Sequence, residues 1–125
     1  DLLLKDKNNR TLLSWRNDEY FGKGWHVPGG IVRLKETLHE RIERVSYAEI
    51  GVLVDYGITP IEIYQFILDQ INRSHCVVFL YKCYLPLTFV PDNKDLNIND
   101  NGFLMWHNDC PYNLLSMQEV YRKLI

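Results

Sequence analysis

The fold is decided by the stretch VPGGIVRLKETLHERIERVSYAEIGV, which runs from Val27 to Val52. Its second half predicts a helix from Thr37 to Ile50, because side chains three or four positions apart form a single stripe. The members of that stripe are Leu38, Ile42, Val45 and Glu49. Gly51 follows directly, and glycine commonly ends a helix. The predicted helix therefore carries apolar residues and one acid on the same face.

The residues before this helix predict a strand followed by a sharp turn. Trp25 to Val27 forms the short strand, with His26 facing either the wall of a site or solvent. Pro28-Gly29-Gly30 then stops it. Ile31–Arg33 is β-branched and apolar, which favours a second short strand. Within the helix, Glu40 and Arg44 stand four positions apart and are expected to pair.

The rest of the chain predicts more strands, a long loop and a closing helix. The expected strands are Leu2–Leu4 and Leu12–Trp15, which form a hairpin, followed by Ile61–Leu68, His75–Leu85 and Phe103–Trp106. Ser116 caps the expected helix, which ends at Leu124. The polar loop Pro86–Gly102 is long for a compact domain, and such loops are usually functional or mobile. Short strands around two helices indicate an α+β fold, a mixed sheet between helices, in one domain spanning residues 1–125.

Composition narrows the class of protein. Hydrophobic residues make up 46% and charged residues 24% of the chain, which is typical of a folded globular domain. The net charge is −2 and no lysine- or arginine-rich run occurs, so nucleic acid is not an expected partner. No apolar run is long enough to predict a membrane span, and no signal peptide is visible, so a cytoplasmic location is expected. The three cysteines form no C-x-x-C pair and are expected to be reduced thiols.

The same deciding stretch carries residues at fixed spacing. Gly30 is followed after five residues by Glu36 and after seven more by Arg44, and then come Glu49 and Gly51-Val52. This pattern resembles the Nudix box G-x5-E-x7-R-E-U-x-E-E-x-G-U, where U is apolar, and the segment before it resembles the family's G-x-W-x-x-P-G-G lead-in. The resemblance implies a Nudix fold. It also implies that Glu36 and Arg44 form a loop-to-helix ion pair that orients Glu49.

Three positions depart from the box. Val45 and Ala48 stand where the pattern has glutamates, and Ser46 stands where it has an apolar residue. One carboxylate cannot hold two or three divalent ions against their mutual repulsion. It can hold a single Mg²⁺, which keeps several waters and accepts one or two protein carboxylates.

The reduced box resembles that of the GDP-mannose mannosyl hydrolases, a Nudix branch that uses one Mg²⁺ and cleaves the carbon–oxygen bond of the sugar. This resemblance implies that Asp1 and Arg16 contact the nucleotide-sugar, Arg16 also assisting catalysis by neutralising phosphate. It implies that the Gly29 carbonyl and Glu49 bind Mg²⁺. His75 begins a strand similar to one in the branch, and is a further substrate-binding candidate. The branch also makes a homodimer an expectation.

The catalytic loop differs from the branch. Counting back from Trp106, the branch's adjacent glutamine and histidine fall on Asp100 and Asn101. Asp100 can replace glutamine on Mg²⁺, but an asparagine cannot take a proton from water. The general base is then expected to be Asp95, Asp100 or His75.

These residues predict Mg²⁺-dependent hydrolysis of a nucleoside-diphosphate sugar to nucleoside diphosphate and free sugar, with inversion at the anomeric carbon. One alternative is a Nudix pyrophosphatase, against which Val45 and Ala48 argue. The other is a catalytically weak nucleotide-sugar binding domain. Asn101 favours it, as does Phe66, which falls near a phosphate-neutralising histidine of the branch.

Overall fold

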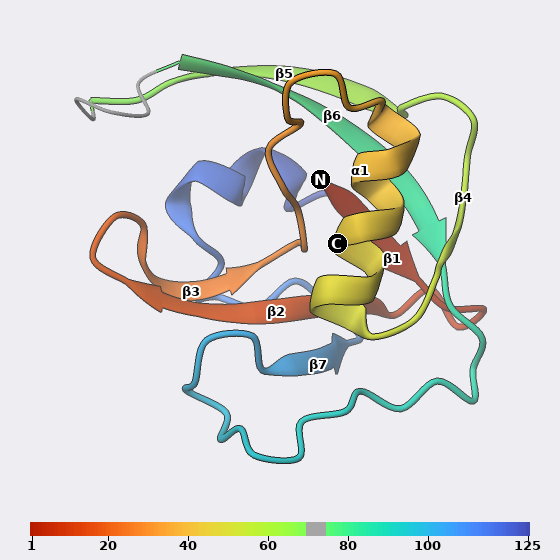
Figure 1. The fold of residues 1–125 in the computed structure, drawn as a ribbon. Coiled ribbons are helices and arrows are strands. Elements are labelled where there is room, and N and C mark those ends of the chain that lie inside the picture. Colours follow the sequence, from red (N-terminus) through yellow and green to blue (C-terminus); the bar gives the residue numbers. More distant parts are fainter. Residues whose placement is uncertain (70–74) are drawn as a thin grey trace.

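The computed structural model describes residues 1–69 and 75–125 and shows strands enclosed by helical segments (Figure 1). The strands are β1 Leu2–Lys5, β2 Thr11–Asp18, β3 Gly22–His26, β4 Asp55–Tyr56, β5 Glu62–Ile67, β6 His75–Tyr84 and β7 Leu104–His107. The helical segments are α1 Leu38–Val45, η1 Ser46–Ile50 and η2 Ser116–Tyr121. The predicted hairpin and longer strands are confirmed, while β4 was not predicted.

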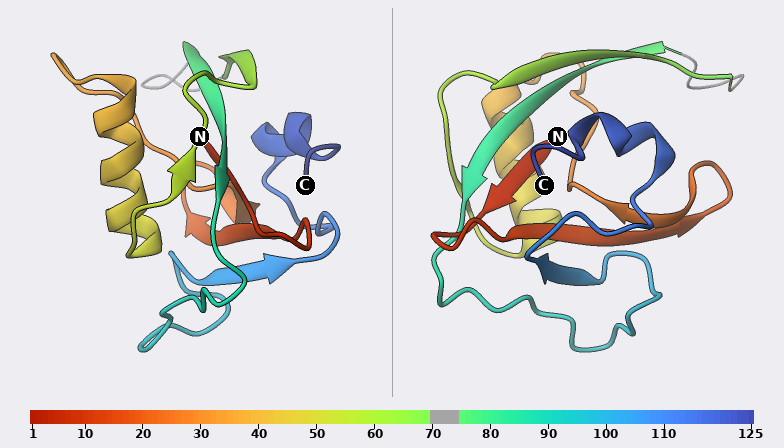
Figure 2. Two further views of the ribbon diagram at one scale, coloured as in Figure 1. Left: turned by 90° about the vertical axis from the view of Figure 1, so that its right-hand side faces the viewer. Right: turned by 180° about the vertical axis from the view of Figure 1, so that it is seen from behind.

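The strands pair in the order β3-β2-β1-β6-β4, while β7 pairs with β2 and β5 with β6. β1 lies parallel to β6, with Leu2 opposite Tyr81, and the other pairings are antiparallel. Figure 2 shows α1 on one side of the strands and η2 on the other. The predicted α+β class, a mixed sheet between helices, is therefore confirmed.

β1 lies at the centre and is buried on both faces. Leu2 and Leu4 pack into the apolar cluster under α1, which includes Ile42 and Val45. Leu3 points the other way, into a second cluster that contains the η2 residue Tyr121. Strands covered on both faces are apolar throughout rather than alternating. The run Leu2–Leu4 thus reflects the two-sided core.

The predicted helix is confirmed, with differences at each end. Thr37 caps α1 and exchanges hydrogen bonds with Glu40, so the Glu40 carboxylate serves the cap and not the predicted pair with Arg44. At the other end the backbone widens into a π-helical turn, in which the Gly51 amide donates to the Ser46 carbonyl at 3.0 Å. Gly51 has φ +85° and ends the helix as predicted.

One predicted element was wrong, and the closing helix differs in type and length. Ile31–Arg33 is not a strand: the Glu36 carboxylate accepts from the Arg33 amide, and the Glu36 amide donates to the Arg33 carbonyl, which closes a turn instead of a sheet ladder. The closing helix is a 3₁₀ segment that stops at Tyr121 and has no side-chain cap. Its start is fixed instead by the Leu115 amide, which donates to the Trp25 carbonyl at 2.9 Å.

The three cysteines are free thiols. Among the described residues, no helix has the length and apolar character needed to cross a bilayer.

Candidate functional site

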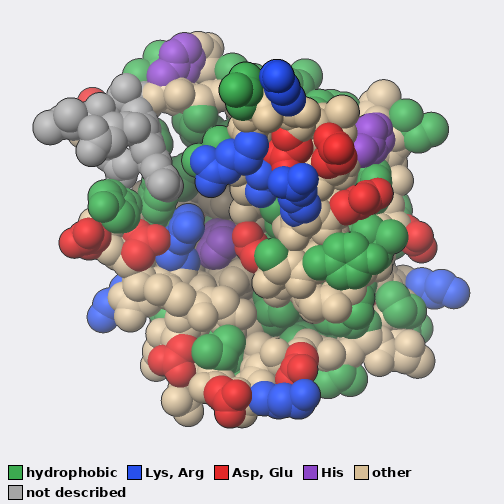
Figure 3. Space-filling model, viewed as in Figure 1, with side chains coloured by type: hydrophobic (Ala, Val, Ile, Leu, Met, Phe, Trp, Pro, Cys, Tyr) green, Lys and Arg blue, Asp and Glu red, His purple; other side chains and the backbone are tan. Residues whose placement is uncertain are grey.

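A cleft of about 1120 Å³ opens beside the helix end that carries Glu49. It is visible as a hollow in Figure 3, with charged and histidine side chains around its mouth. Its walls come from β2, β3, the glycine turn, α1 with η1, β6, the long loop and η2. The cleft thus gathers residues from both ends of the chain.

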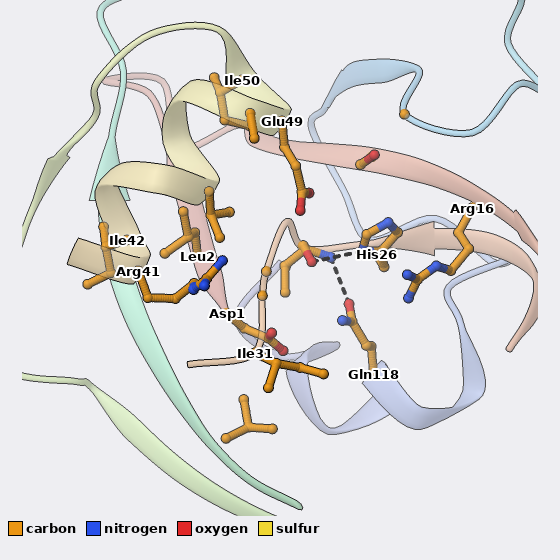
Figure 4. A pocket seen from close by; sticks show the side chains of 18 of the residues that line it. Asp1, Leu2, Arg16, His26, Ile31, Arg41, Ile42, Glu49, Ile50 and Gln118 are labelled. Carbon is orange, nitrogen blue, oxygen red and sulfur yellow. Dashed lines mark hydrogen bonds between the residues drawn. The ribbon is translucent and has the colours of Figure 1, made fainter. Parts of the chain in front are cut away.

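Glu49 projects from the π-helical turn η1 into this cleft (Figure 4). Burial raises the pKa of its carboxyl to about 7, although the Gly29 amide and the Arg16 guanidinium act in the opposite direction. Without a cation, the carboxyl therefore keeps its proton to a higher pH than an ordinary glutamate. A bound cation would favour the charged form. π-Helical turns occur frequently at functional sites.

The two glycines of the turn allow close approaches that a side chain would block. A Cβ at Gly29 would overlap the Asp1 carboxylate, and one at Gly30 would lie 2.8 Å from Val45 Cγ2. Val45 is only 4% exposed and belongs to the core under α1. The box position that usually carries an acid is therefore occupied by a core residue.

The predicted ion pair between Glu36 and Arg44 is present, at 3.2 Å. Arg41 is a closer partner that was not predicted, with its terminal nitrogen 2.7 Å and its Nε 2.9 Å from the Glu36 carboxylate. Burial acts against ionisation, but the Arg33 amide and the two guanidinium groups hold the pKa of Glu36 below its ordinary value. This network ties the loop after Gly30 to α1.

Five other predicted site residues line the cleft with Glu49, namely Gly30 and the four described next. Gly29 lines its wall, and Asp1 accepts a hydrogen bond from the Tyr121 hydroxyl at 2.9 Å. Arg16 pairs with Asp18 at 2.9 Å and lies over the Phe21 ring. The fourth is His75, whose Nε2 lies 2.7 Å from Gln65 Nε2.

The predicted acids of the long loop lie elsewhere. Neither Asp95 nor Asp100 lines the cleft. The Asp100 carboxylate accepts from the Asn97 amide at 2.7 Å and so stabilises the loop itself. Asn101 does line the cleft, but its side chain exchanges hydrogen bonds with the Asn17 backbone. Asp92, which was not predicted as a site residue, is the loop acid that lines the cleft.

Two polar residues of the cleft floor, His26 and Gln118, flank Val27 (Figure 4). The His26 Nδ1 lies 2.9 Å from the Val27 carbonyl oxygen, and the Gln118 Oε1 accepts from the Val27 amide at 2.7 Å. Burial, with the positive charge of Arg16, lowers the pKa of His26 to about 4. The strand alternation allowed His26 to face the site. No local pattern pointed to Gln118, which reaches Val27 from the far end of the chain.

The donor chemistry of the cleft fits one Mg²⁺ and not a metal cluster. Among the described residues, no group of three His, Cys, Asp or Glu side chains is placed to hold a metal ion. Glu49 offers one desolvated carboxylate, which accepts a hydrogen bond from the Gly29 amide. Mg²⁺ accepts such sparse protein ligation because waters and substrate phosphates complete its shell.

Comparisons with known proteins bear on the fold. No protein-family model and no curated protein matches the chain. Among solved structures, the Escherichia coli ORF135 protein is 18% identical over 85% of this chain and 69% of its own, with a TM-score of 0.55. The MutT protein from Methanosarcina mazei Go1 is 20% identical over 85% and 72%, with a TM-score of 0.55. DR0079 from Deinococcus radiodurans is 20% identical over 86% and 64%, with a TM-score of 0.53. At this identity the similarity shows the fold alone, which is the MutT-type Nudix fold predicted from the box.

Proposed function

From the Nudix fold and the contents of its cleft, we propose that this domain is a Mg²⁺-dependent hydrolase of nucleoside-diphosphate derivatives. Within that class we propose nucleoside-diphosphate sugars, of the GDP-mannose type, as substrates. One observation carries the finer proposal: Glu49 is a desolvated carboxylate in the cleft, while Val45 and Ala48 occupy the places of the other box acids. A helix end that keeps one of the box acids suits one cation that neutralises a diphosphate.

The roles of the residues follow from their chemistry. Glu49 and the Gly29 carbonyl would hold Mg²⁺, which when bound neutralises charge on the diphosphate. Arg16 would bind the phosphate oxygens, since a guanidinium matches their geometry. Asp1 would contact the sugar half of the substrate.

The proposed reaction is substitution at the anomeric carbon. A water oxygen bonds to this carbon on the face opposite the leaving group, as the bond from carbon to the diphosphate oxygen breaks. The diphosphate leaves with the electron pair, and the water gives up a proton. Of the three predicted acceptors, His75 is the one that lines the cleft, and we assign the proton to its imidazole. In this role its Nε2 would exchange the contact with the Gln65 amide nitrogen for one with the water.

A second candidate function is a nucleotide-sugar binding domain with weak or no turnover. The position of the loop acids favours it, because Asp95 and Asp100 lie outside the cleft and Asn101 is held by the Asn17 backbone. In this case the cleft would bind the same ligands without an efficient proton acceptor.

The test is a screen of nucleotide-sugars with Mg²⁺ in ¹⁸O-labelled water. We expect nucleoside diphosphate and free sugar, with the label in the sugar. Nucleoside monophosphate and sugar phosphate would instead indicate a pyrophosphatase and refute carbon–oxygen cleavage. Tight binding without turnover would favour the binding domain. Glu49→Gln should abolish the activity, whereas Glu43→Gln should not, because Glu43 is an exposed acid of the same helix that does not line the cleft.

A further inference from the structure

The backbone amide and carbonyl of Val27 determine which atoms of His26 and Gln118 remain free to donate or accept a hydrogen bond. Val27 directly follows β3 and is fully buried, so its amide and carbonyl have no access to water. The amide is bonded to Gln118 and the carbonyl to His26. Since an amide can only donate and a carbonyl can only accept, each contact determines which atom of the partner remains available.

Gln118 is left with a donor. Its Oε1 is the atom that accepts from the Val27 amide, so the orientation of the side-chain amide is set by chemistry and its Nε2 carries the free N–H groups. The residue is only 6% exposed and lines the cleft, and its Nε2 has no hydrogen-bond partner in residues 1–69 and 75–125. Nε2 is not sealed from the cleft, so water or a ligand there can supply the acceptor that its N–H groups lack within the protein.

His26 is left with an acceptor. Because the Val27 carbonyl can only accept, the Nδ1 that contacts it carries the hydrogen. The neutral ring then presents a lone pair at Nε2. The low pKa of His26, about 4, agrees with a ring that stays neutral near physiological pH.

The cleft lining therefore includes a donor at Gln118 and an acceptor at His26, each next to Val27. Phosphate oxygens are mainly acceptors, so they suit Gln118 but not the lone pair of His26. A hydroxyl group both donates and accepts, and suits both. Glu49 projects toward the same floor (Figure 4), and in a nucleoside-diphosphate sugar the sugar ring is the part bonded directly to the distal phosphate. The nucleobase is separated from the diphosphate by the ribose.

We propose that His26 Nε2 and Gln118 Nε2 form a hydroxyl-recognition site that binds the sugar ring of the substrate. This inference rests on the proposed function, because it takes the diphosphate to lie at Glu49. It names the sugar as the part of the ligand that this pair selects. A nucleobase edge, which also joins a donor to an acceptor, is the competing occupant.

The test compares two ligands, GDP-mannose and GDP, in calorimetric titrations with Mg²⁺. His26→Asn keeps a donor near the Nδ1 position and, because the side chain is shorter, leaves no acceptor at the Nε2 position. Gln118→Met removes the donor without adding charge. The control is the same substitution at a histidine outside the cleft, His39→Asn, on the outer face of α1. We expect both site variants to bind GDP-mannose roughly 5- to 100-fold more weakly, the range for losing one buried hydrogen bond, and to bind GDP within about twofold of wild type.

Three other results would overturn the inference. Equal losses for GDP-mannose and GDP would place the nucleotide, and with it the base, on this pair. Unchanged binding of both ligands would mean that the pair does not contact them. In both cases the proposed function would stand, since the wild-type protein still binds the nucleotide-sugar. Failure of the wild-type protein to bind any nucleotide-sugar would refute the proposed function as well. Gln118→Met leaves the Val27 amide without a partner, so His26→Asn decides the question if that variant does not fold.

Discussion

Replacing Glu49 by glutamine should stabilise the metal-free protein at alkaline pH, although it removes the main proposed metal ligand. Glutamine keeps the size of the side chain and an oxygen that can accept from the Gly29 amide. It removes a negative charge that burial makes unfavourable. The Glu49 carboxylate would thus lower the stability of the metal-free fold while providing a ligand for a cation.

The magnitude follows from the proton affinity of Glu49. Its pKa is about 7 in the folded protein against an ordinary value of 4.5, a difference worth about 3 kcal/mol. Because the folded pKa is the higher one, the associated stability is fully present below pH 4.5 and is lost as pH rises through about 7. At pH 8 without metal, the free energy of unfolding of Glu49→Gln should therefore exceed that of the wild type by up to about 3 kcal/mol.

His26 changes the stability of the wild-type protein with pH in the opposite direction to Glu49. Its folded pKa is about 4 against an ordinary 6.5, so its contribution is present above pH 6.5 and is lost as pH falls through about 4. Between pH 4.5 and 6.5 the two trends offset each other, and the wild-type protein should show little change. Glu49→Gln should uncover the His26 trend, with stability falling as the solution is acidified.

The assay is urea unfolding followed by tryptophan fluorescence from pH 4.5 to 8 in EDTA, with Glu43→Gln as the control. Added Mg²⁺ should stabilise the wild type by mass action and leave Glu49→Gln unchanged. A Glu49→Gln protein that is no more stable than wild type at pH 8 in EDTA would refute the reasoning. It would mean that the carboxylate is adequately solvated or paired.

Three further outcomes are expected. In urea unfolding, Val45→Glu should destabilise the fold by several kcal/mol because it buries an unpaired charge. Ala48→Glu changes an exposed position, so its free energy of unfolding should stay within about 0.5 kcal/mol of wild type. Gly30→Ala should cost about 1–3 kcal/mol in the same assay, because its Cβ would lie 2.8 Å from the Val45 side chain. Arg16→Met should weaken GDP binding in Mg²⁺ by roughly 10- to 100-fold in calorimetry, the loss of one charge-assisted contact, whereas Lys23→Met, outside the cleft, should not.

The sequence predicted those features that depend on local periodicity and on fixed spacing. The stripe of Leu38, Ile42 and Val45 located the helix, Gly51 located its end, and the box spacing led to Glu49 and the Glu36 network. The π-helical turn at Ser46–Ile50 was not predicted, because a widened turn has no periodicity of its own in so short a segment.

Other features escaped prediction because distant contacts decide them. Ile31–Arg33 has the composition of a strand, but Glu36 bonds the Arg33 backbone groups, and no strand within residues 1–69 and 75–125 pairs with the segment. Gln118 is a polar residue in a short helix, and its role arises only when η2 packs against Val27. Asp100 was predicted from a count along the chain and Asp95 from its place in the long loop, and neither argument fixes where a long loop folds.

The parallel pairing of β1 with β6 has a consequence for the order of events during protein synthesis. β2, which ends at Asp18, can join β1 as soon as the hairpin leaves the ribosome, but β6 ends only at Tyr84. At about 5–20 residues per second, the second edge of β1 waits roughly 3 to 13 s for its partner. Throughout that interval the apolar run Leu2–Leu4 keeps one unpaired edge, which is the kind of surface that nascent chains aggregate through and chaperones bind.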